Sequence, residues 1–288
     1  MKIINSLKYA YKEIKNKGKD LDWWQNRILS RIIGPMLFRK NDGFYVMKEE
    51  WKNLIILDAC RYDIFKEVNT INGELNCKIS RGSVTTDFLT ENFGKGKFKD
   101  IIYITGNPYV TKLLQGKFYK IVSVWREGWD EDFGTVLPST MVDYTIEVYK
   151  KYPEKKLIIH FMQPHSPWIK KEESQSKHGP METIGKNIGR KESLRRYKDN
   201  LRLVLPYVNE LINILDGKTI ITADHGEMIG EKIHPFFPLK WYGHPGKVRN
   251  KILTEVPWLI IDRGEDKQKI ERIRIRNKIQ NLKKGVKI

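Results

Sequence analysis

The stretch that most constrains this chain is Thr219 to Glu227, which reads TIITADHGE. Its first part is apolar and β-branched, which predicts a short buried strand that ends abruptly in polar residues. In open α/β sheets, ligands and metals bind at the carboxyl ends of the strands. Asp224 and His225 can both ligate a divalent cation, and Gly226 lets the backbone turn away behind them. The alternative is an ordinary strand that ends in a polar loop.

Polar residues follow apolar runs at several other places in the chain. They are Asp58 after the run 54–57, Thr85 after the run 75–80, Gln163 and His165 after the run 156–162, and His244 in the segment 241–246. Thr85 lies in a glycine- and hydroxyl-rich turn that leads into a predicted helix. Hydroxyls at such a place are commonly N-caps, although a helix amino end also attracts anions. Because these residues come from distant parts of the chain, their shared position after predicted strands indicates one common site.

Predicted strands alternate with predicted helices along most of the sequence. The clearest helix covers 191–216, where apolar residues recur at steps of three and four, and Pro206 should kink or split it. The segment 170–190 is polar and rich in glycine and lysine, which predicts a loop or lid. The alternation favours an α/β fold with a mostly parallel, doubly wound sheet.

Charge is concentrated at the two ends of the chain. The net charge is +18 over 288 residues; residues 1–50 carry 11 Lys/Arg against 6 Asp/Glu, and residues 262–288 carry 10 against 4. Basic ends of this kind fit nucleic acid, an anionic membrane surface or an anionic polymer, or simply form a solvated surface. A specific nucleic-acid site is not expected, because the basic residues lack the interleaved aromatic residues of a single-strand channel.

The sequence contains no clear signal for the cellular location of the protein. There are two cysteines, Cys60 and Cys77, without metal or disulfide spacing, and we find neither a signal-peptide pattern nor an apolar run of membrane-spanning length. A cytoplasmic protein is the default expectation. The apolar residues of 20–37 could share one helical face, which fits either a helix that lies on a membrane surface or one that packs on the catalytic domain. We therefore expect a basic helical extension over 1–50, a catalytic domain over 51–262 and a basic tail over 263–288.

Four sequence motifs resemble the alkaline phosphatase superfamily, in particular its sulfatase-like branch and the lipoteichoic-acid-synthase type of phosphotransferase. They are LIILDACRYD at 54–63, GSVTTDF at 82–88, QPHSPW at 163–168 and TADHGEMIGE at 222–231, with YGHPG at 242–246 behind them. They occur in the family order and span most of the chain. The resemblance implies a three-layer α/β/α catalytic domain that binds metal and acts on phosphate or sulfate esters.

The resemblance also implies roles for individual residues. Asp58, Asp224 and His225 would bind a metal, and Thr85 would be the nucleophile and touch the same metal. His165 and His244 would hold the transferred group, assist the leaving group or bind a second metal. Carboxylate and imidazole ligands together suit Zn²⁺ or Mn²⁺ better than Ca²⁺. Glu227, Arg61 and Asp63 are expected to support the site from outside it, and His160 is expected to pack in the core.

The sulfatase pattern is incomplete in this chain. Nothing matches the C/S-x-P-x-R signature whose first residue becomes formylglycine, and a D-x-x-x-H pair for a second metal is missing around 163–169. The expected reaction is therefore phosphoryl transfer from an anionic ester, free or linked to a glycan or lipid, with one metal and a second left open. The alternatives are a sulfatase without formylglycine and an inactive relative that binds an anionic glycan or lipid headgroup. The basic amino-terminal region could add peripheral membrane contact.

Overall fold

The computed structural model describes residues 15, 18–19, 21–37, 41–169, 181–235 and 237–262. Most of the predicted basic helix over 3–16, the whole of the segment 170–180 and the tail from 263 onward lie outside these residues. The helices are α2 (Leu21–Ile28), η1 (Leu29–Ile33), α3 (Gly34–Leu37), η2 (Val46–Lys48), α4 (Tyr62–Val68), α5 (Thr85–Phe93), α6 (Pro108–Leu114), η3 (Val124–Arg126), α7 (Pro138–Lys151), α8 (Met181–Ile214) and α9 (Lys251–Thr254). The strands are β1 (Asn53–Leu57), β2 (Glu74–Ile79), β3 (Phe98–Thr105), β4 (Phe118–Ser123), β5 (Trp129–Asp130), β6 (Thr135–Val136), β7 (Lys156–Phe161), β8 (Thr219–Thr222), β9 (Met228–His234), β10 (Phe237–Gly243) and β11 (Glu255–Ile261).

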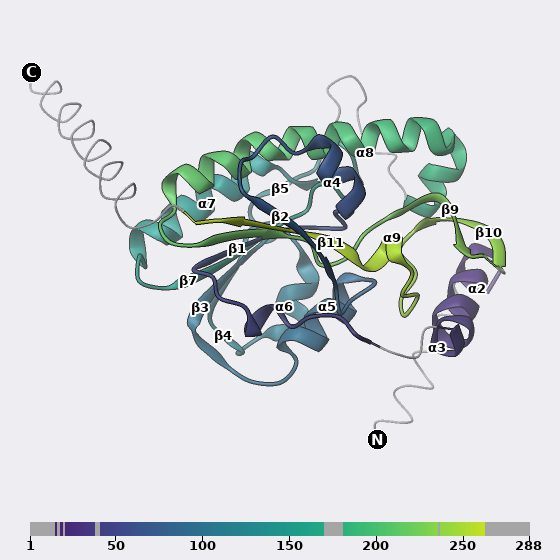
Figure 1. Ribbon diagram of the computed structural model, residues 1–288, viewed down its shortest axis with the longest axis horizontal. Coiled ribbons are helices and arrows are strands. Elements are labelled where there is room, and N and C mark those ends of the chain that lie inside the picture. The colour runs from purple at the N-terminus through teal and green to yellow at the C-terminus, as the bar shows by residue number, and fades with distance from the viewer. Residues whose placement is uncertain are drawn as a thin grey trace, which may run out of the picture.

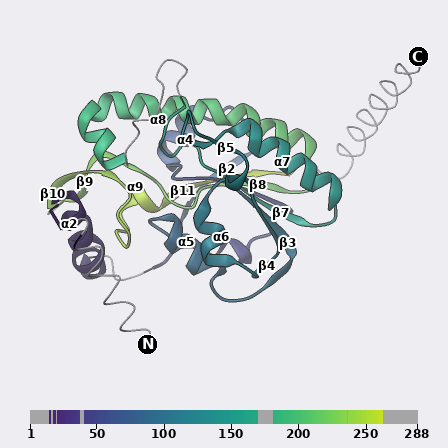
Figure 2. The same ribbon diagram turned by 180° about the vertical axis from the view of Figure 1, so that it is seen from behind.

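A seven-stranded sheet in the order β2-β11-β8-β1-β7-β3-β4 forms the centre of the molecule. Its strands run parallel except β11, which is antiparallel to both β8 and β2. The helices α4, α7 and α8 cover one face and α5 and α6 the other (Figures 1 and 2). The predicted mostly parallel, three-layer α/β/α class is therefore confirmed.

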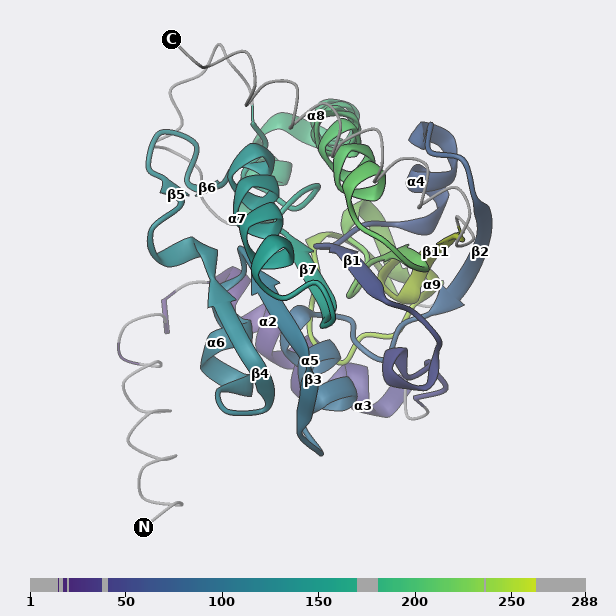
Figure 3. The same cartoon turned by 90° about the vertical axis from the view of Figure 1, so that its left-hand side faces the viewer.

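The alternation of buried residues along β1 explains why both faces are covered. Ile55 and Leu57 pack with α4, α7 and α8, whereas Leu54 and Ile56 pack with α5 and α6. A strand buried on both faces reads as a continuous apolar run, as the sequence of β1 does. The view along the sheet in Figure 3 shows the two helical layers on either side of it.

Two details of the helices differ from the sequence prediction. The predicted loop 170–190 is wrong at its carboxyl end, since α8 already begins at Met181. Of the two outcomes expected at Pro206, a split does not occur, because α8 continues through Pro206; its non-helical backbone lies at Gly189, with φ +78°. Glycine adopts such a conformation without a steric penalty.

Candidate active site

The residues predicted from four separate motifs meet at the carboxyl edge of the central sheet. Asp58 follows β1, Asp224 lies just beyond β8, and Thr85 is the first residue of α5. One ligand atom each from Asp58, Asp224 and His225 lies within 4.8 Å of the others, and all three residues are buried. We call these three residues together with Thr85 the Asp58 cluster.

Thr85 is held against this cluster by its hydroxyl. Its Oγ1 donates a hydrogen bond of 2.6 Å to Oδ2 of Asp224 and lies 3.2 Å from Nε2 of His225. The hydroxyl of Ser83 instead donates to the carbonyl of Pro245 at 3.4 Å. Among the hydroxyls of the turn, Thr85 thus has the contacts that a nucleophile beside a cation requires.

The imidazole of His225 presents a lone pair to the cluster. Its Nδ1 lies 2.8 Å from the carbonyl of Gly226, which can only accept, so Nδ1 carries the proton. Burial lowers the pKa of His225 to about 4, against the raising effect of Asp224, and the ring is neutral at physiological pH. Its Nε2 then faces carboxylate oxygens of Asp224 at 3.3 Å and Asp58 at 3.8 Å. Three lone-pair donors directed at one another call for a cation between them.

Asp58 shows the same deficit of positive charge. Burial and the charge of Asp224 raise the pKa of Asp58 well above its ordinary value, although Asn107 donates to its Oδ2 at 2.7 Å. Its other oxygen, Oδ1, is buried and makes no hydrogen bond to the described part of the chain. An unpaired buried carboxylate oxygen is costly unless a metal ligates it. The Asp58 cluster therefore fits a divalent cation with mixed carboxylate and imidazole ligands.

Asp224 is better compensated than Asp58. Burial acts to raise its pKa, but His225, His160, the Thr85 hydroxyl and the backbone N–H of Ala59 together lower it. The hydrogen bond from Ala59 N is 3.0 Å long and comes from the turn that follows Asp58. Asp224 is thus the carboxylate that stays ionised and orients Thr85.

His160 lies at the floor of the cluster and is fully buried, so the expectation that it packs in the core is confirmed. Its Nδ1 lies 3.0 Å from the hydroxyl of Tyr103, and its Nε2 lies 3.7 Å from Asp58 and 3.9 Å from Asp224. Burial lowers its pKa, against the raising effect of Asp224. The core position therefore also brings this ring beside both carboxylates.

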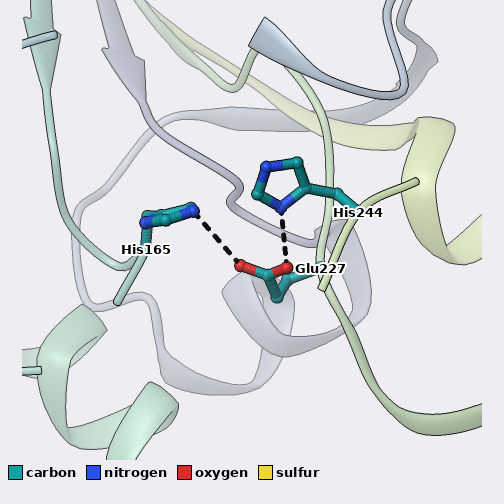
Figure 4. A group of neighbouring side chains, drawn as sticks. All are labelled: His165, Glu227 and His244. Carbon is teal, nitrogen blue, oxygen red and sulfur yellow. Dashed lines mark hydrogen bonds and ion pairs between the residues drawn. The ribbon is translucent and has the colours of Figure 1, made fainter. Parts of the chain in front are cut away.

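A second group of possible ligands lies beside the first, which we call the Glu227 cluster. Glu227 stands between two imidazoles, with its Oε1 2.8 Å from Nδ1 of His244 and its Oε2 3.8 Å from Nε2 of His165 (Figure 4). Burial acts to raise the pKa of Glu227, but electrostatic interactions with His244, His165 and His225 and the hydrogen bond to His244 lower it. Glu227, which the sequence placed outside the ligand set, therefore lies in a second candidate group of ligands.

The two clusters are adjacent. The rings of His225 and His244 lie 4.4 Å apart between centroids, and those of His165 and His244 lie 5.1 Å apart. The loop that carries His165 is tied to the first cluster because its backbone N–H donates to the carbonyl of Asp58 at 3.2 Å. An anionic group bound at Thr85 would consequently meet both imidazoles of the Glu227 cluster.

The turn after β1 is fixed by contacts from distant elements. Ala59 has φ +58°, a conformation that costs free energy in a non-glycine residue and is common near functional sites. The buried hydroxyl of Tyr197 on α8 donates to the carbonyl of Ala59 at 2.6 Å and accepts from the N–H of Arg61 at 2.9 Å. Arg61 in turn pairs with Asp63 and Glu231 at 2.7 and 2.8 Å. Arg61 and Asp63 therefore support the strand end, as the sequence indicated.

Gly226 is required by close packing. Its backbone N–H donates to the carbonyl of Leu253 at 2.8 Å, and a Cβ at this position would come within 2.0 Å of the carbonyl oxygen of Ile252. Only glycine can approach that backbone so closely. The DHGE segment is therefore locked against α9 with Asp224, His225 and Glu227 all turned into the site.

Sequence reasoning missed Asn107 and Tyr103. Both come from β3 and the turn after it, and no charged residue marks that strand end. The sequence T-G-N-P at 105–108 did carry a signal, since Asn before Pro at a helix start is a typical N-cap. Asn107 does cap α6 by accepting from Tyr109 N at 2.9 Å, while its amide group donates to Asp58.

No family model matches the sequence, and no curated protein matches it significantly. Solved structures do resemble it. The integral membrane protein lipooligosaccharide phosphoethanolamine transferase A from Neisseria meningitidis aligns with a TM-score of 0.53 and 15% identity, covering 75% of this chain and 48% of that protein. Its soluble domain aligns with the same score and identity, covering 75% of this chain and 77% of the domain. This chain has the fold of that soluble phosphoethanolamine transferase domain.

A third structure, the carboxyl-terminal periplasmic domain of phosphoethanolamine transferase EptC from Campylobacter jejuni, aligns with a TM-score of 0.49 and 16% identity over 74% of this chain and 79% of that domain. The chain spans about half the length of the membrane transferase, 48%, and about three quarters of its soluble domain, 77%. At these identities the likeness concerns the fold, which confirms the resemblance drawn from the sequence motifs at that level.

Proposed function

We propose that this chain is a metal-dependent phosphotransferase or phosphoesterase that uses Thr85 as its nucleophile. The observation that carries the proposal is the position of the Thr85 hydroxyl, 2.6 Å from Asp224 and 3.2 Å from His225 in a buried group of cation ligands. The fold shared with phosphoethanolamine transferase domains is consistent with phosphoryl transfer.

The Asp58 cluster would hold the divalent cation, through Asp58, Asp224, His225 and the hydroxyl of Thr85. When bound, such a cation lowers the pKa of a neighbouring hydroxyl and neutralises phosphoryl oxygens. Zn²⁺ and Mn²⁺ fit the ligand types best. The neutral Nε2 of His225 and the unpaired Oδ1 of Asp58 are the groups whose lone pairs this cation would satisfy.

In the proposed reaction, Oγ1 of Thr85 attacks phosphorus and a phosphothreonine forms while the bond from phosphorus to the leaving oxygen breaks. Asp224 Oδ2, which accepts the Thr85 hydrogen bond, orients the hydroxyl for this attack and receives its proton. Water or an acceptor alcohol then displaces Thr85 from phosphorus. The proton of this acceptor passes to the imidazole, His165 or His244, that protonated the leaving oxygen, and Asp224 returns the first proton to Oγ1 of Thr85. All protons are then back in place, and the two steps need no redox partner.

His165 and His244 would act on the non-bridging and leaving oxygens. Both rings face Glu227. Burial lowers the pKa of His165 against the raising effect of Glu227, and an imidazole that is protonated at either position would donate to the leaving oxygen. The same three side chains also form a candidate cation site. We include a second metal at the Glu227 cluster in the proposal. The ratio of bound metal to protein tests it: the ratio should be lower in Glu227→Gln than in the wild type if the second metal is present.

The proposed substrate is an anionic phosphate ester that is linked to a lipid or a glycan. This part of the proposal draws on the names of the structural neighbours, which transfer phosphoethanolamine to lipooligosaccharide. The basic charge of this chain, +18 overall, favours an anionic substrate in the same way.

An ester panel tests the proposal. Purified protein is stripped of metal, reloaded with Zn²⁺ or Mn²⁺ and assayed with aryl phosphate monoesters, diesters and sulfates. We expect metal-dependent turnover of a phosphate ester, a fall in kcat of about 10³-fold or more in Thr85→Ala, and little change in Ser83→Ala, the matched hydroxyl control. Turnover of the sulfate alone, or full activity in Thr85→Ala, would overturn the proposal.

A further inference from the structure

The amino-terminal helical segment exposes a stripe of large apolar side chains. Trp24, Ile28, Ile32 and Met36 recur every four residues along α2, η1 and α3, and are 39%, 45%, 54% and 62% exposed. Among the described residues, the other large hydrophobic side chains with comparable exposure are Tyr109, Tyr119 and Trp129, which lie on separate elements. A contiguous exposed apolar patch usually marks a contact surface.

The helical segment that carries the stripe packs on the rest of the protein through its opposite side. Leu29, on the other side of the segment, is buried with Ile33 against a small core formed by β9, β10 and α9. The core residues are Met228, Ile233, Trp241, Val248 and Leu253. The segment therefore packs on the domain, which was one of the two alternatives drawn from the sequence. Its outer face still carries the exposed apolar stripe that the other alternative, a helix on a membrane surface, requires.

Basic residues are frequent in the amino-terminal sequence and on the elements that support the stripe. In the sequence, residues 1–37 carry 8 Lys/Arg against 3 Asp/Glu, and residues 228–254, whose core supports the segment, carry 5 Lys/Arg against a single acid. Arg31 is exposed within the segment, and Lys232, Lys240, Lys247 and Lys251 are exposed on its supporting elements. An apolar face in a region rich in Lys and Arg is the pattern of helices that lie in the interface of an anionic bilayer.

We propose that the stripe Trp24–Ile28–Ile32–Met36 and its basic surroundings bind the surface of an anionic lipid bilayer. A second copy of this chain is a poorer occupant for two reasons. Four partly exposed side chains are few against the roughly 20–30 residues a side of a stable interface. Two such faces would also bring together like charges in a chain of net charge +18.

The segment that would bind the bilayer lies close to the candidate active site. A Cβ on Gly34 would lie 2.8 Å from the carbonyl oxygen of Lys247, and one on Gly246 would lie 3.9 Å from both Ser30 and Val84. Gly246 follows His244 by two positions, and Val84 directly precedes Thr85. The lipid-bound segment would thus lie beside both clusters. Among the described residues no helix is long and apolar enough to cross a bilayer.

Vesicle co-sedimentation of the full chain tests this proposal, with phosphatidylcholine vesicles that do or do not contain phosphatidylglycerol. The test variant is Ile32→Gln/Met36→Gln, which removes apolar surface without changing charge. The matched control is Tyr109→Gln/Tyr119→Gln, which removes two aromatic side chains that are 48% and 46% exposed elsewhere. Circular dichroism and light scattering on each protein report folding and oligomeric state.

We expect the wild type and the tyrosine control to bind the anionic vesicles, and the stripe variant to bind about tenfold more weakly. Equal binding by all three proteins, or no binding by the wild type, would overturn the proposal. A wild-type dimer that the stripe variant converts to a monomer would assign the stripe to a second copy instead. Vesicle binding does not require turnover, so loss of aryl phosphatase activity with binding retained would count against the proposed chemistry alone.

Discussion

Replacing Asp58 with Asn should stabilise the metal-free protein and abolish its response to metal. One ligand oxygen each of Asp58 and Asp224 lies within 4.8 Å in a buried site. At that separation and an effective dielectric constant of about 20, two unit charges repel by about 3.5 kcal/mol. The raised pKa of Asp58 means that protonation relieves part of this repulsion. We therefore expect a gain of about 1–3 kcal/mol in the free energy of unfolding, since Asn can still accept from Asn107.

The assay is thermal unfolding of both proteins at about pH 8, with EDTA and with Zn²⁺ or Mn²⁺. For a domain of this size the gain in EDTA corresponds to a rise in Tm of about 5 °C. With metal at roughly 1,000 times its Kd, the wild type should gain about 4.1 kcal/mol, and the variant, which lacks a charged ligand, should gain much less. The order of stability should therefore reverse between the two conditions.

Asp63→Asn is the control. Asp63 lies in the same turn but is paired with Arg61 at 2.7 Å, and its side chain is 64% exposed. Its loss should lower stability slightly in both conditions and leave the metal-induced shift unchanged. If Asp58→Asn lost stability in EDTA, or kept the full metal-induced shift, the reasoning about an uncompensated carboxylate pair would be refuted.

Two further predictions concern the support of the site. Asn107→Ser keeps an N-cap residue but loses the 2.7 Å hydrogen bond to Asp58, so calorimetric titration should show metal affinity reduced about tenfold; unchanged affinity would contradict this. Glu231→Gln should lower stability by about 1–3 kcal/mol at neutral pH. The pKa of Glu231 is lowered because Arg61 outweighs the opposing effect of burial, so its contribution is present above the ordinary value of 4.5 and lost as the pH falls through the lower, folded-state value. Urea unfolding of wild type and variant should converge in acid, and a constant difference would refute the assignment.

The sequence was most informative where residue type and strand periodicity coincide. Apolar runs that end in Asp58 and Asp224 predicted two central strands. They also predicted that these two residues lie near each other, because the carboxyl ends of parallel strands share one edge of the sheet. The resemblance of the motifs then selected Thr85 within a turn of three hydroxyl residues. In the structure Thr85 lies against Asp224 and His225, and its role as nucleophile remains a prediction.

The features that could not be read from the sequence depend on packing between distant elements. Glu227 was expected outside the ligand sets and His160 in the core, and their contacts with the clusters arise from the orientation of the DHGE loop and from the pairing of β7 beside β1. Asn107 contacts Asp58 although α4, β2, α5 and β3 lie between the two residues in the sequence. The continuation of α8 through Pro206 likewise reflects burial of the helix on the domain, which overrides local preference.

The most direct test of the proposed chemistry is to look for phosphate on Thr85. The metal-loaded protein is mixed with a phosphate ester that it turns over, quenched in acid during turnover, digested and analysed by mass spectrometry. The two-step displacement predicts phosphate on Thr85, absent from Thr85→Ala and from protein kept in EDTA. Phosphate on Ser83, Thr86 or another residue, or rapid turnover with no labelled residue under any quench condition, would contradict a Thr85 nucleophile.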